Sequence, residues 1–445
     1  MRSLMTFFAN NHARGNHINM NCTTIKASLL TLILLAFGAG STAYAKVWSV
    51  KDFGAKGDGK TKDTEAIQAT IEAAFNYGGG TVELPSGTYL TGSIELKDNI
   101  DFHFAEGSIL IGSPDLEDYC SADSHPQNYS SPRTSENISG GHLLYGVGVK
   151  NVTLRGPGKI DGNSRHFFLH GNYVDVGKRV TLPDRPGQMI WFADSENIRI
   201  LDMEITGAPY WSCFIHNCTN VWIKGCKVHT EKDEWITHNG DGIDIDRCRF
   251  VHISDCSIDT HDDCITLRAS GAERLTSPQN CEYVTVTNCI LSSGCNAIRL
   301  GVGEGTIKDA AFSNIVIHDS KTAFNIVSGY SREDYGASIE SIRFSNIIVN
   351  AERLMKIHHM RGEGEIRDIT FDGISGRTQT ISQIWAKKSH PFKNIILREV
   401  NTADGYECIN ADVTNQNSSF QKIRLTGAVL RSRRQNIEKE KNLLY

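Results

Sequence analysis

Four nonapeptides alternate apolar and polar residues in one shared pattern: Asn197-Ile-Arg-Ile-Leu-Asp-Met-Glu-Ile205, Asn220-Val-Trp-Ile-Lys-Gly-Cys-Lys-Val228, Phe250-Val-His-Ile-Ser-Asp-Cys-Ser-Ile258 and Tyr283-Val-Thr-Val-Thr-Asn-Cys-Ile-Leu291. Such alternation is what a strand with one buried face requires. Less regular copies occur at 149–160, 312–317, 342–349, 366–374, 395–400 and 423–429. A short strand repeat without helices cannot bury its apolar face alone, so its copies must stack. The sequence therefore predicts an all-β solenoid.

Cysteines support this stacking, because they recur at two matching positions of three successive repeats, as Cys218/Cys226, Cys248/Cys256 and Cys281/Cys289. Equivalent positions lie on top of one another in a solenoid, so we interpret these side chains as interior ladders of small apolar groups. Zinc ligation is the alternative, and the absence of any Cys-x-x-Cys pair disfavours it. Cys22 lies in an expected leader, and the other eleven of the 12 cysteines are an odd number that excludes a complete disulfide framework.

A helix is predicted from Asp63 to Phe75, ahead of the repeats, because Asp63 is an N-cap candidate and Ile67 and Ile71 share one face. Glycines 78–80 end it. We therefore predict a single-stranded right-handed parallel β-helix of about ten coils, with this helix covering its N-terminal end.

The N-terminus has the pattern of an export signal. Lys26 precedes an apolar run at 27–37, and Ala43-Tyr44-Ala45 supplies the small-x-small pattern of a cleavage site. We expect a signal peptide over 1–45, a β-helix domain over 46–445, and a periplasmic or secreted location. No segment approaches the ~20 apolar residues that a membrane-spanning helix needs, so no membrane span is expected.

Charge excludes one class of partner. The formal net charge is −5 and the cations are spread along the chain, so a nucleic-acid surface is not expected. The dense basic group Arg431–Arg434 is interpreted as a solvated tail, with a binding patch as the alternative. Nothing in the sequence indicates an oligomeric state.

Several segments carry a family resemblance. Asp52-Phe-Gly-Ala-Lys-Gly-Asp-Gly59 resembles the entry segment of the pectin-degrading β-helix superfamily. Three further segments resemble family 28 of the glycoside hydrolases: Ala208-Pro-Tyr-Trp211, Asn239-Gly-Asp-Gly-Ile-Asp-Ile-Asp-Arg-Cys248 and Asp259-Thr-His-Asp-Asp-Cys-Ile265. That family contains polygalacturonases and rhamnogalacturonan hydrolases. The resemblance implies inverting acid/base hydrolysis of galacturonate- or rhamnogalacturonan-type bonds in a pectic polysaccharide or oligosaccharide, without a cofactor or metal ion. Within it, Asp262 is implied as general acid, with Asp241 and Asp263 holding the attacking water.

Glycoside hydrolysis requires such acids for a chemical reason that does not depend on the resemblance. Inverting hydrolysis needs a carboxylic acid and a carboxylate ~6.5 to 9.5 Å apart. Coils of a parallel solenoid lie ~4.8 Å apart, so acids on neighbouring coils can form such a pair. Consecutive Asp262 and Asp263 can share one cleft only near a turn or bulge. As an alternative, Asp241, Asp244 and Asp246 could cap turns or bind calcium, but their spacing from Asp262 favours catalysis.

The chain departs from the family downstream. Where the family has Gly-His-Gly and Arg-Ile-Lys, it reads Cys295-Asn296-Ala297 and Asn325-Ile326-Val327. The leaving-sugar site has thereby lost two cations, so we expect a neutral sugar there, smooth polygalacturonic acid as a poor substrate, and trimming from a chain end. The expected substrate-binding residues are Asn239, Asp244, His261, Arg268, Asn296, Arg299 and Asn325.

Structural interpretations compete at several of these positions. Arg268 and Arg299 could instead form salt bridges with the aspartates. His238 could hydrogen-bond to the acids or to sugar hydroxyls, or could be an ordinary surface histidine. Trp211 and Trp235 could stack on a sugar ring, but for Trp211 packing in the core is favoured.

Two other functions remain open. A lyase or epimerase could use the same scaffold, and a pectate-type lyase would need an arginine base and bound calcium. A non-catalytic glycan-binding solenoid, such as a surface adhesin, would account for the lost histidine, arginine and lysine. The three retained aspartates argue against it.

Overall fold

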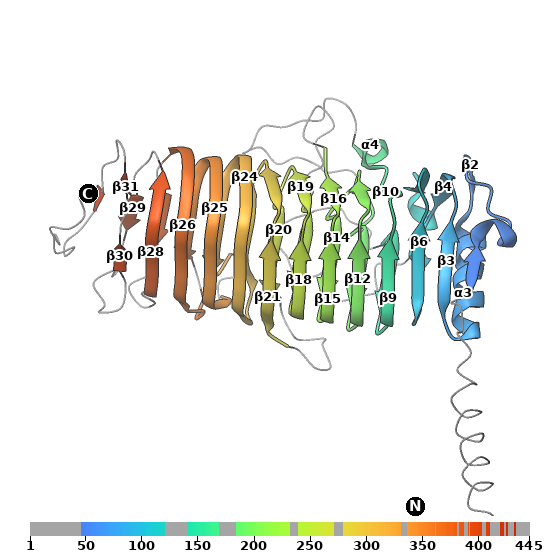
Figure 1. Cartoon of the computed structure of the whole chain (residues 1–445), viewed down its shortest axis with the longest axis horizontal. Helices are drawn as coiled ribbons and strands as arrows, with labels where there is room; N and C mark the ends of the chain where they lie inside the picture. The colour runs from blue at the N-terminus through green and yellow to red at the C-terminus, as the bar shows by residue number, and fades with distance from the viewer. Residues whose placement is uncertain are drawn as a thin grey trace, which may run out of the picture. The chain divides into compact units, whose positions relative to one another are not determined.

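The structure is a computed structural model. It describes residues 46–120, 141–168, 184–231, 239–270, 279–330, 336–360, 362–380, 382–386, 390 and 392–402, followed by four short strands between 406 and 432. Strands pair in parallel from one coil to the next and lie side by side along the chain (Figure 1). The predicted parallel β-helix is confirmed. The expected leader and the positions Trp235 and His238 lie outside the described residues.

Each coil contributes strands to three parallel faces. The first face contains β1 (Val47–Ser49), β3 (Gly80–Leu84), β6 (Ile100–Phe104), β9 (Lys150–Arg155), β12 (Glu196–Leu201), β15 (Thr219–Lys224), β18 (Arg249–Ser254) and β21 (Cys281–Thr287). The second contains β2 (Asp58–Lys62), β4 (Gly87–Thr91), β7 (Ser108–Gly112), β10 (Lys159–Asp161), β13 (Glu204–Thr206), β16 (Lys227–His229), β19 (Ser257–Thr260) and β22 (Ile290–Ser293).

The third face carries the candidate site. It contains β5 (Ile94–Glu95), β8 (Leu144–Val147), β11 (Ile190–Ala193), β14 (Cys213–His216), β17 (Ile243–Asp246), β20 (Ile265–Ala269) and β23 (Asn296–Gly303). In later coils the strands continue around the corners, as β24 (Thr306–Ser328), β25 (Ser338–His359), β26 (Ile366–Thr380) and β28 (Lys393–Thr402). Shorter strands follow on the three faces: β27 (Ser382–Trp385), β29 (Tyr406–Ile409), β30 (Ser419–Gln421), β31 (Arg424–Leu425) and β32 (Arg431–Ser432).

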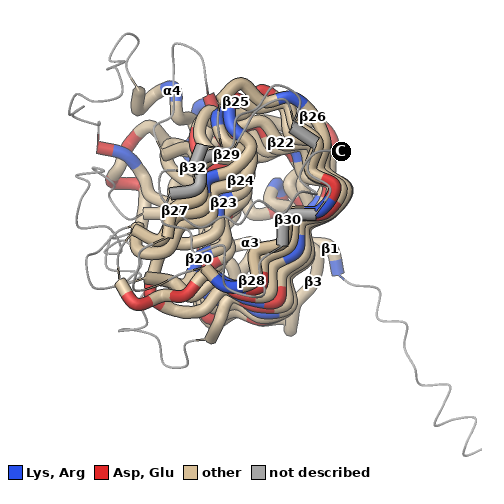
Figure 2. Tube along the Cα trace, turned by 90° about the vertical axis from the view of Figure 1, so that its left-hand side faces the viewer, with Lys and Arg blue, Asp and Glu red and all other residues tan. Residues whose placement is uncertain are grey.

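Identical positions of successive coils form ladders inside and outside the solenoid. Inside, the Phe344 ring stacks on Phe312 at 4.8 Å and on Phe371 at 4.7 Å between centroids. Outside, the Asn151 amide donates to Asn99 and the Asn197 amide donates to Asn151. Asparagine suits this corner because its φ is positive there, a conformation that asparagine tolerates better than most residues. Figure 2 looks along the stack and shows acidic and basic residues recurring at the same corners of successive coils.

The cysteine ladders are confirmed. Cys218, Cys248 and Cys281 are fully buried at the start of three strands paired in register, the first two directly before β15 and β18 and the third as the first residue of β21. Cys226, Cys256 and Cys289 form a second buried row. All six thiols are free, so they pack as small apolar groups.

A helix covers Thr64–Tyr77 (α3), close to the predicted range Asp63 to Phe75. Its buried face includes Ile67 and Ile71, and it contacts β1, β3 and β5. Asp63 does not cap the helix through its side chain, but accepts hydrogen bonds from the backbone amides of Lys56 and Gly57. Its role as a cap of the solenoid, like the number of about ten coils, stays a prediction. The other helices of the described residues are short: η1 (Val50–Phe53), η2 (Leu116–Asp118) and α4 (Ser164–Phe167).

Candidate active site

Three aspartates meet where the chain enters the third face. Asp241 lies two residues before β17, and Asp262 and Asp263 lie in the turn between β19 and β20. The Gly242 amide donates to the Asp263 carbonyl at 2.8 Å, which holds the two coils together at this point. Because the turn interrupts the strand alternation, the consecutive Asp262 and Asp263 can both reach one site. Asp241 and Asp263 are buried and Asp262 is half-buried.

Asp263 is the most firmly held of the three. The Asn296 amide donates to its Oδ1 at 2.5 Å, and the Arg299 guanidinium donates to its Oδ2 at 3.0 Å. Both partners lie on β23, one coil further on. In this chain Asn296 therefore supports the acidic cluster, at a position where the resembled family has histidine.

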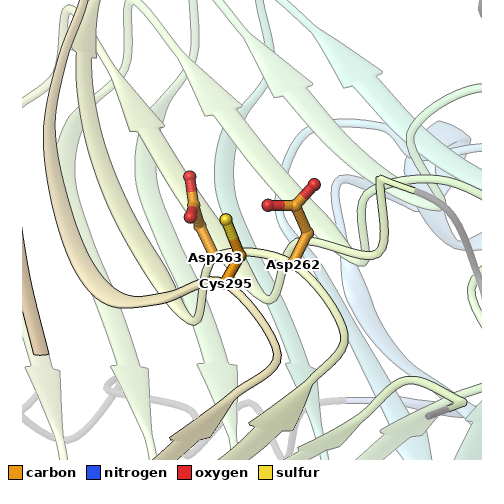
Figure 3. A group of neighbouring side chains, drawn as sticks. All are labelled: Asp262, Asp263 and Cys295. Atoms are coloured by element: carbon orange, nitrogen blue, oxygen red, sulfur yellow. The ribbon is translucent and has the colours of Figure 1, made fainter. Parts of the chain in front are cut away.

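Cys295 completes the cluster. Figure 3 shows its sulfur between the carboxyl groups of Asp262 and Asp263, and one ligand atom from each of these three residues lies within 4.8 Å of the others. Burial raises the pKa of the Cys295 thiol, as do the charges of Asp262 and Asp263, so the thiol stays protonated near neutral pH. Two carboxylates and a sulfur are a donor set that a borderline cation such as Zn²⁺ accepts. The expected independence from metal ions therefore needs its own experiment.

Burial and mutual repulsion set the protonation of the acids. Burial raises the pKa of Asp262 to about 6, and the charge of Asp263 adds to this effect. Burial raises the pKa of Asp241 well above its usual range, and Asp244, Asp262 and Asp263 contribute further. One carboxyl of such a cluster can be protonated near neutral pH while another is ionised, which is the division that acid/base catalysis uses.

The next two acids along β17 are each paired. Asp244 accepts a hydrogen bond from the Arg268 guanidinium at 3.1 Å, and that guanidinium lies 4.2 Å from the centroid of the Trp211 ring. Asp246 lies 3.1 Å from a ring nitrogen of His216. Burial raises the pKa of Asp244 to about 7, whereas His216 holds the pKa of Asp246 at about 2 despite burial.

Both expected cations form the salt bridges of the structural interpretation, since Arg268 and Arg299 are ion-paired with Asp244 and Asp263. Their part in substrate binding stays a prediction. Trp211 is 8% exposed and packs against Tyr210 and Phe214, which favours a place in the core. Arg268 and Arg299 thus hold the carboxylates of Asp244 and Asp263 in place, and Trp211 packs against the Arg268 guanidinium.

The other expected binding residues are spread around the acids. Asn239 accepts a hydrogen bond from the buried Arg185 at 3.0 Å. His261 is half-buried beside Asp262, and its backbone amide donates to Thr230. Asn325 is half-buried on β24, in register with Arg299. The structure thus gathers Asp241, Asp244, Asp262, Asp263, Asn296 and Arg299 closely, with Asn325 one coil further on.

Sequence reasoning missed several contributors. His216 is in register with Asp246 on the neighbouring coil, and aligning the repeats further would have found this pairing. Arg185 precedes the first of the aligned repeats, and no local pattern links it to Asn239. Cys295 has no sequence signal beyond its departure from the family pattern.

No helix among the described residues has both the length and the apolar character needed to cross a membrane.

Comparisons with known proteins agree with this geometry. Residues 126–421 match the family described as glycosyl hydrolases family 28, and residues 47–153 match the one described as rhamnogalacturonase A/epimerase, pectate lyase-like. A probable polygalacturonase from Vitis vinifera is 27% identical over 64% of this chain and 58% of its own length. An exo-poly-α-D-galacturonosidase from Dickeya chrysanthemi is 24% identical over 62% of this chain and 51% of its own length.

The chain thus spans between half and three fifths of these two relatives. Among solved structures, an exopolygalacturonase from Thermotoga maritima superposes with a TM-score of 0.66 at 21% identity, over 86% of this chain and 91% of that one. That likeness concerns the fold. The family match covers well over half of the sequence and includes all three clustered aspartates, so this chain belongs to the glycosyl hydrolases family 28.

Proposed function

We propose that this chain is an exported glycoside hydrolase that cleaves pectic polysaccharides or oligosaccharides from a chain end. The observation that carries the proposal is the convergence of Asp241, Asp262 and Asp263 on one site, where burial holds the pKa of Asp262 at about 6. A carboxyl with such a pKa can be protonated at mildly acidic pH and can donate its proton to a leaving oxygen.

The roles follow from the contacts. Asp262 donates its proton to the glycosidic oxygen as the bond to the anomeric carbon breaks, and a water molecule attacks that carbon. Asp263 accepts a proton from the water, since two donors including a guanidinium hold it as a carboxylate. Asp241, whose pKa burial raises strongly, then serves as a protonated group that orients the water. Solvent exchange restores the starting protonation of Asp262 and Asp263.

Inversion at the anomeric carbon rests on the family resemblance. One oxygen from Asp262 and one from Asp263 lie within 4.8 Å, which is shorter than the ~6.5 to 9.5 Å typical of an inverting pair. The carboxyl separation alone therefore does not support inversion, and the stereochemistry of the product has to be measured.

The two alternatives have less support. An arginine base must lose a proton, but Arg268 and Arg299 are bound to carboxylates, and these outweigh burial and raise the pKa of both. This disfavours a pectate-type lyase. A purely glycan-binding solenoid would have no use for a cluster of repelling buried carboxyls, which costs stability.

The names of two relatives favour cleavage from a chain end. The Dickeya and Thermotoga proteins carry names that specify exo-acting enzymes of galacturonan, and we extend this mode to the present chain. The proposal also includes a leader over 1–45 and a mature domain over 46–445, which N-terminal sequencing of the exported chain would check.

The purified mature chain should release reducing sugar from at least one of homogalacturonan, rhamnogalacturonan I or rhamnogalacturonan II fragments. Products should be saturated, should appear first as short end-derived sugars, and should not depend on a metal ion. Mass spectrometry, ultraviolet absorbance and a chelator control check these points, and early-time NMR gives the anomeric configuration. Unsaturated products would indicate a lyase instead of a hydrolase. Binding to these glycans without turnover would indicate a glycan-binding solenoid.

We expect kcat/KM to fall above pH 6, by about tenfold per pH unit, because the acid must be protonated and the pKa of Asp262 is about 6.

The contribution of Asp262 to the stability of the folded state should also decrease as the pH rises. A carboxyl whose pKa is raised on folding stabilises the native state at low pH, and this contribution is lost as the pH rises through its folded-state value. Circular dichroism at each pH separates the two effects, and a rate that stays constant from pH 5 to 8 would exclude Asp262 as the acid.

A further inference from the structure

Outward side chains continue the third face beyond the acids. Arg299, Asn325, Lys356 and Gln383 occupy one row across four successive coils, because β23, β24, β25 and β27 pair in register. Successive coils lie ~4.8 Å apart, so this row extends from the acidic cluster along the solenoid. A polysaccharide that crosses the acids along this face passes over these residues.

Lys356 stands out in this row. It is half-buried, and among the described residues no carboxylate lies within ion-pair distance of its ammonium. Burial lowers its pKa, and the nearby charge of Arg353 lowers it further. Keeping a partly desolvated charge without a counterion costs free energy, which a bound anion would recover.

Polar atoms around Lys356 also lack partners. Within the described part of the chain, Asn325 Oδ1, His358 Nε2 and two guanidinium nitrogens of Arg299 are buried without a hydrogen bond. The His358 ring stacks on Trp385 at 4.5 Å, and burial lowers its pKa to about 4, so its imidazole is neutral. Each such atom costs ~1 to 3 kcal/mol when it stays unsatisfied. Together they form a surface that a ligand rich in hydroxyl and carboxylate groups satisfies.

Space for such a ligand lies next to this surface. A hollow of about 480 Å³ lies over the corner where β24, β25 and β26 pass from the second face to the third, lined among others by Gly294, Lys321, Glu352 and Gln379. One lining residue, Gly294, is the sequence neighbour of Cys295 in the acidic cluster. The charges of Arg268 and Arg299 are already balanced, because each guanidinium is ion-paired with an aspartate.

We infer that Lys356 binds the carboxylate of an acidic sugar of the substrate, with Asn325 and His358 bonding to hydroxyl groups of the same chain. This inference rests on the proposed function, whose active site it extends. The inference replaces the expectation of a neutral sugar beyond the acids. Asn325 and Val327 stand where the family has cations, and Lys356 provides a cation in register with Asn325 on the next coil.

The test measures binding and turnover separately. In an Asp262→Asn background, isothermal titration with trigalacturonic acid should give a Kd at least tenfold higher when Lys356→Met is added. With Lys356 alone replaced, KM for oligogalacturonides should rise similarly with little change in kcat. Methyl-esterified oligomers should not distinguish Lys356→Met from wild type, and Lys356→Arg should bind nearly as well as wild type. Lys227→Met, an exposed lysine on β16, is the matched control.

Equal Kd values with and without Lys356, or no binding of trigalacturonic acid at all, would overturn the inference. Equal losses on acidic and esterified oligomers would do the same, since they indicate a structural role. The proposed function fails on a different result, which is binding of pectic oligomers by the wild-type protein without hydrolysis, or release of unsaturated products. Circular dichroism of Lys356→Met and of Lys356→Gln ensures that folded proteins are compared.

Discussion

Asp262→Asn should give a folded protein that no longer hydrolyses pectic substrates. An amide has nearly the volume of the carboxyl but cannot supply a proton, so the rate should fall by the ~10² to 10⁴ typical of a lost general acid. Stability should not decrease, because the replacement removes a half-buried group that repels Asp263. The kcat from reducing-sugar release and the melting temperature check the two halves of this expectation.

Asp309→Asn is the matched control, since Asp309 is exposed at a corner with positive φ, where asparagine is equally tolerated. It should keep wild-type rate and stability. If Asp262→Asn also keeps a near wild-type rate, the proton comes from another group, and Asp241 is the next candidate because its pKa is raised as well.

The sequence predicted the fold because its signals are local. Alternation in nonapeptides such as 220–228 requires one buried face, and the matching positions of Cys226 and Cys256 identify which residues stack. The catalytic candidates were predictable for a similar reason, since Asp262 and Asp263 stand at a strand entrance, where a turn lets both reach one site.

Pairing between coils was less predictable. Whether Arg299 contacts Asp263 or a sugar depends on the register of strands separated by 36 residues, and loops of unequal length intervene. The bond between Arg185 and Asn239 spans 54 residues, and no repeat position links them. Lys356 had no sequence signal, because its importance comes from its burial and from the lack of a carboxylate partner among the residues that the structure describes. Contacts set by long-range register cannot be deduced from alternation alone.

Arg299→Met should destabilise the fold strongly as well as impair catalysis. Arg299 Nη1 lies 3.0 Å from Asp263 Oδ2, and the Asp263 side chain is fully buried. Removing one partner of a buried pair leaves an uncompensated charge, at a typical cost of ~3 to 5 kcal/mol in the free energy of unfolding. Urea unfolding followed by circular dichroism measures this loss. The exposed pair of Arg343 and Asp372 is the control, because Arg343→Met should cost at most ~1 kcal/mol.

A double-mutant cycle with Asp263→Asn separates the structural from the catalytic role of this pair. Asp263→Asn and Arg299→Met each leave a buried polar group without its partner, whereas the double variant removes both charges. The double variant should therefore be more stable than Arg299→Met alone, with a favourable coupling within the 0.5 to ~3 kcal/mol range of contacting residues. Its activity should remain as low as that of Asp263→Asn, because methionine restores packing and supplies no base. If Arg299→Met costs no more stability than Arg343→Met, the guanidinium does not stabilise Asp263 in solution and is available to a substrate carboxylate. In that case Arg299 would compete with Lys356 as the cation that selects acidic sugars.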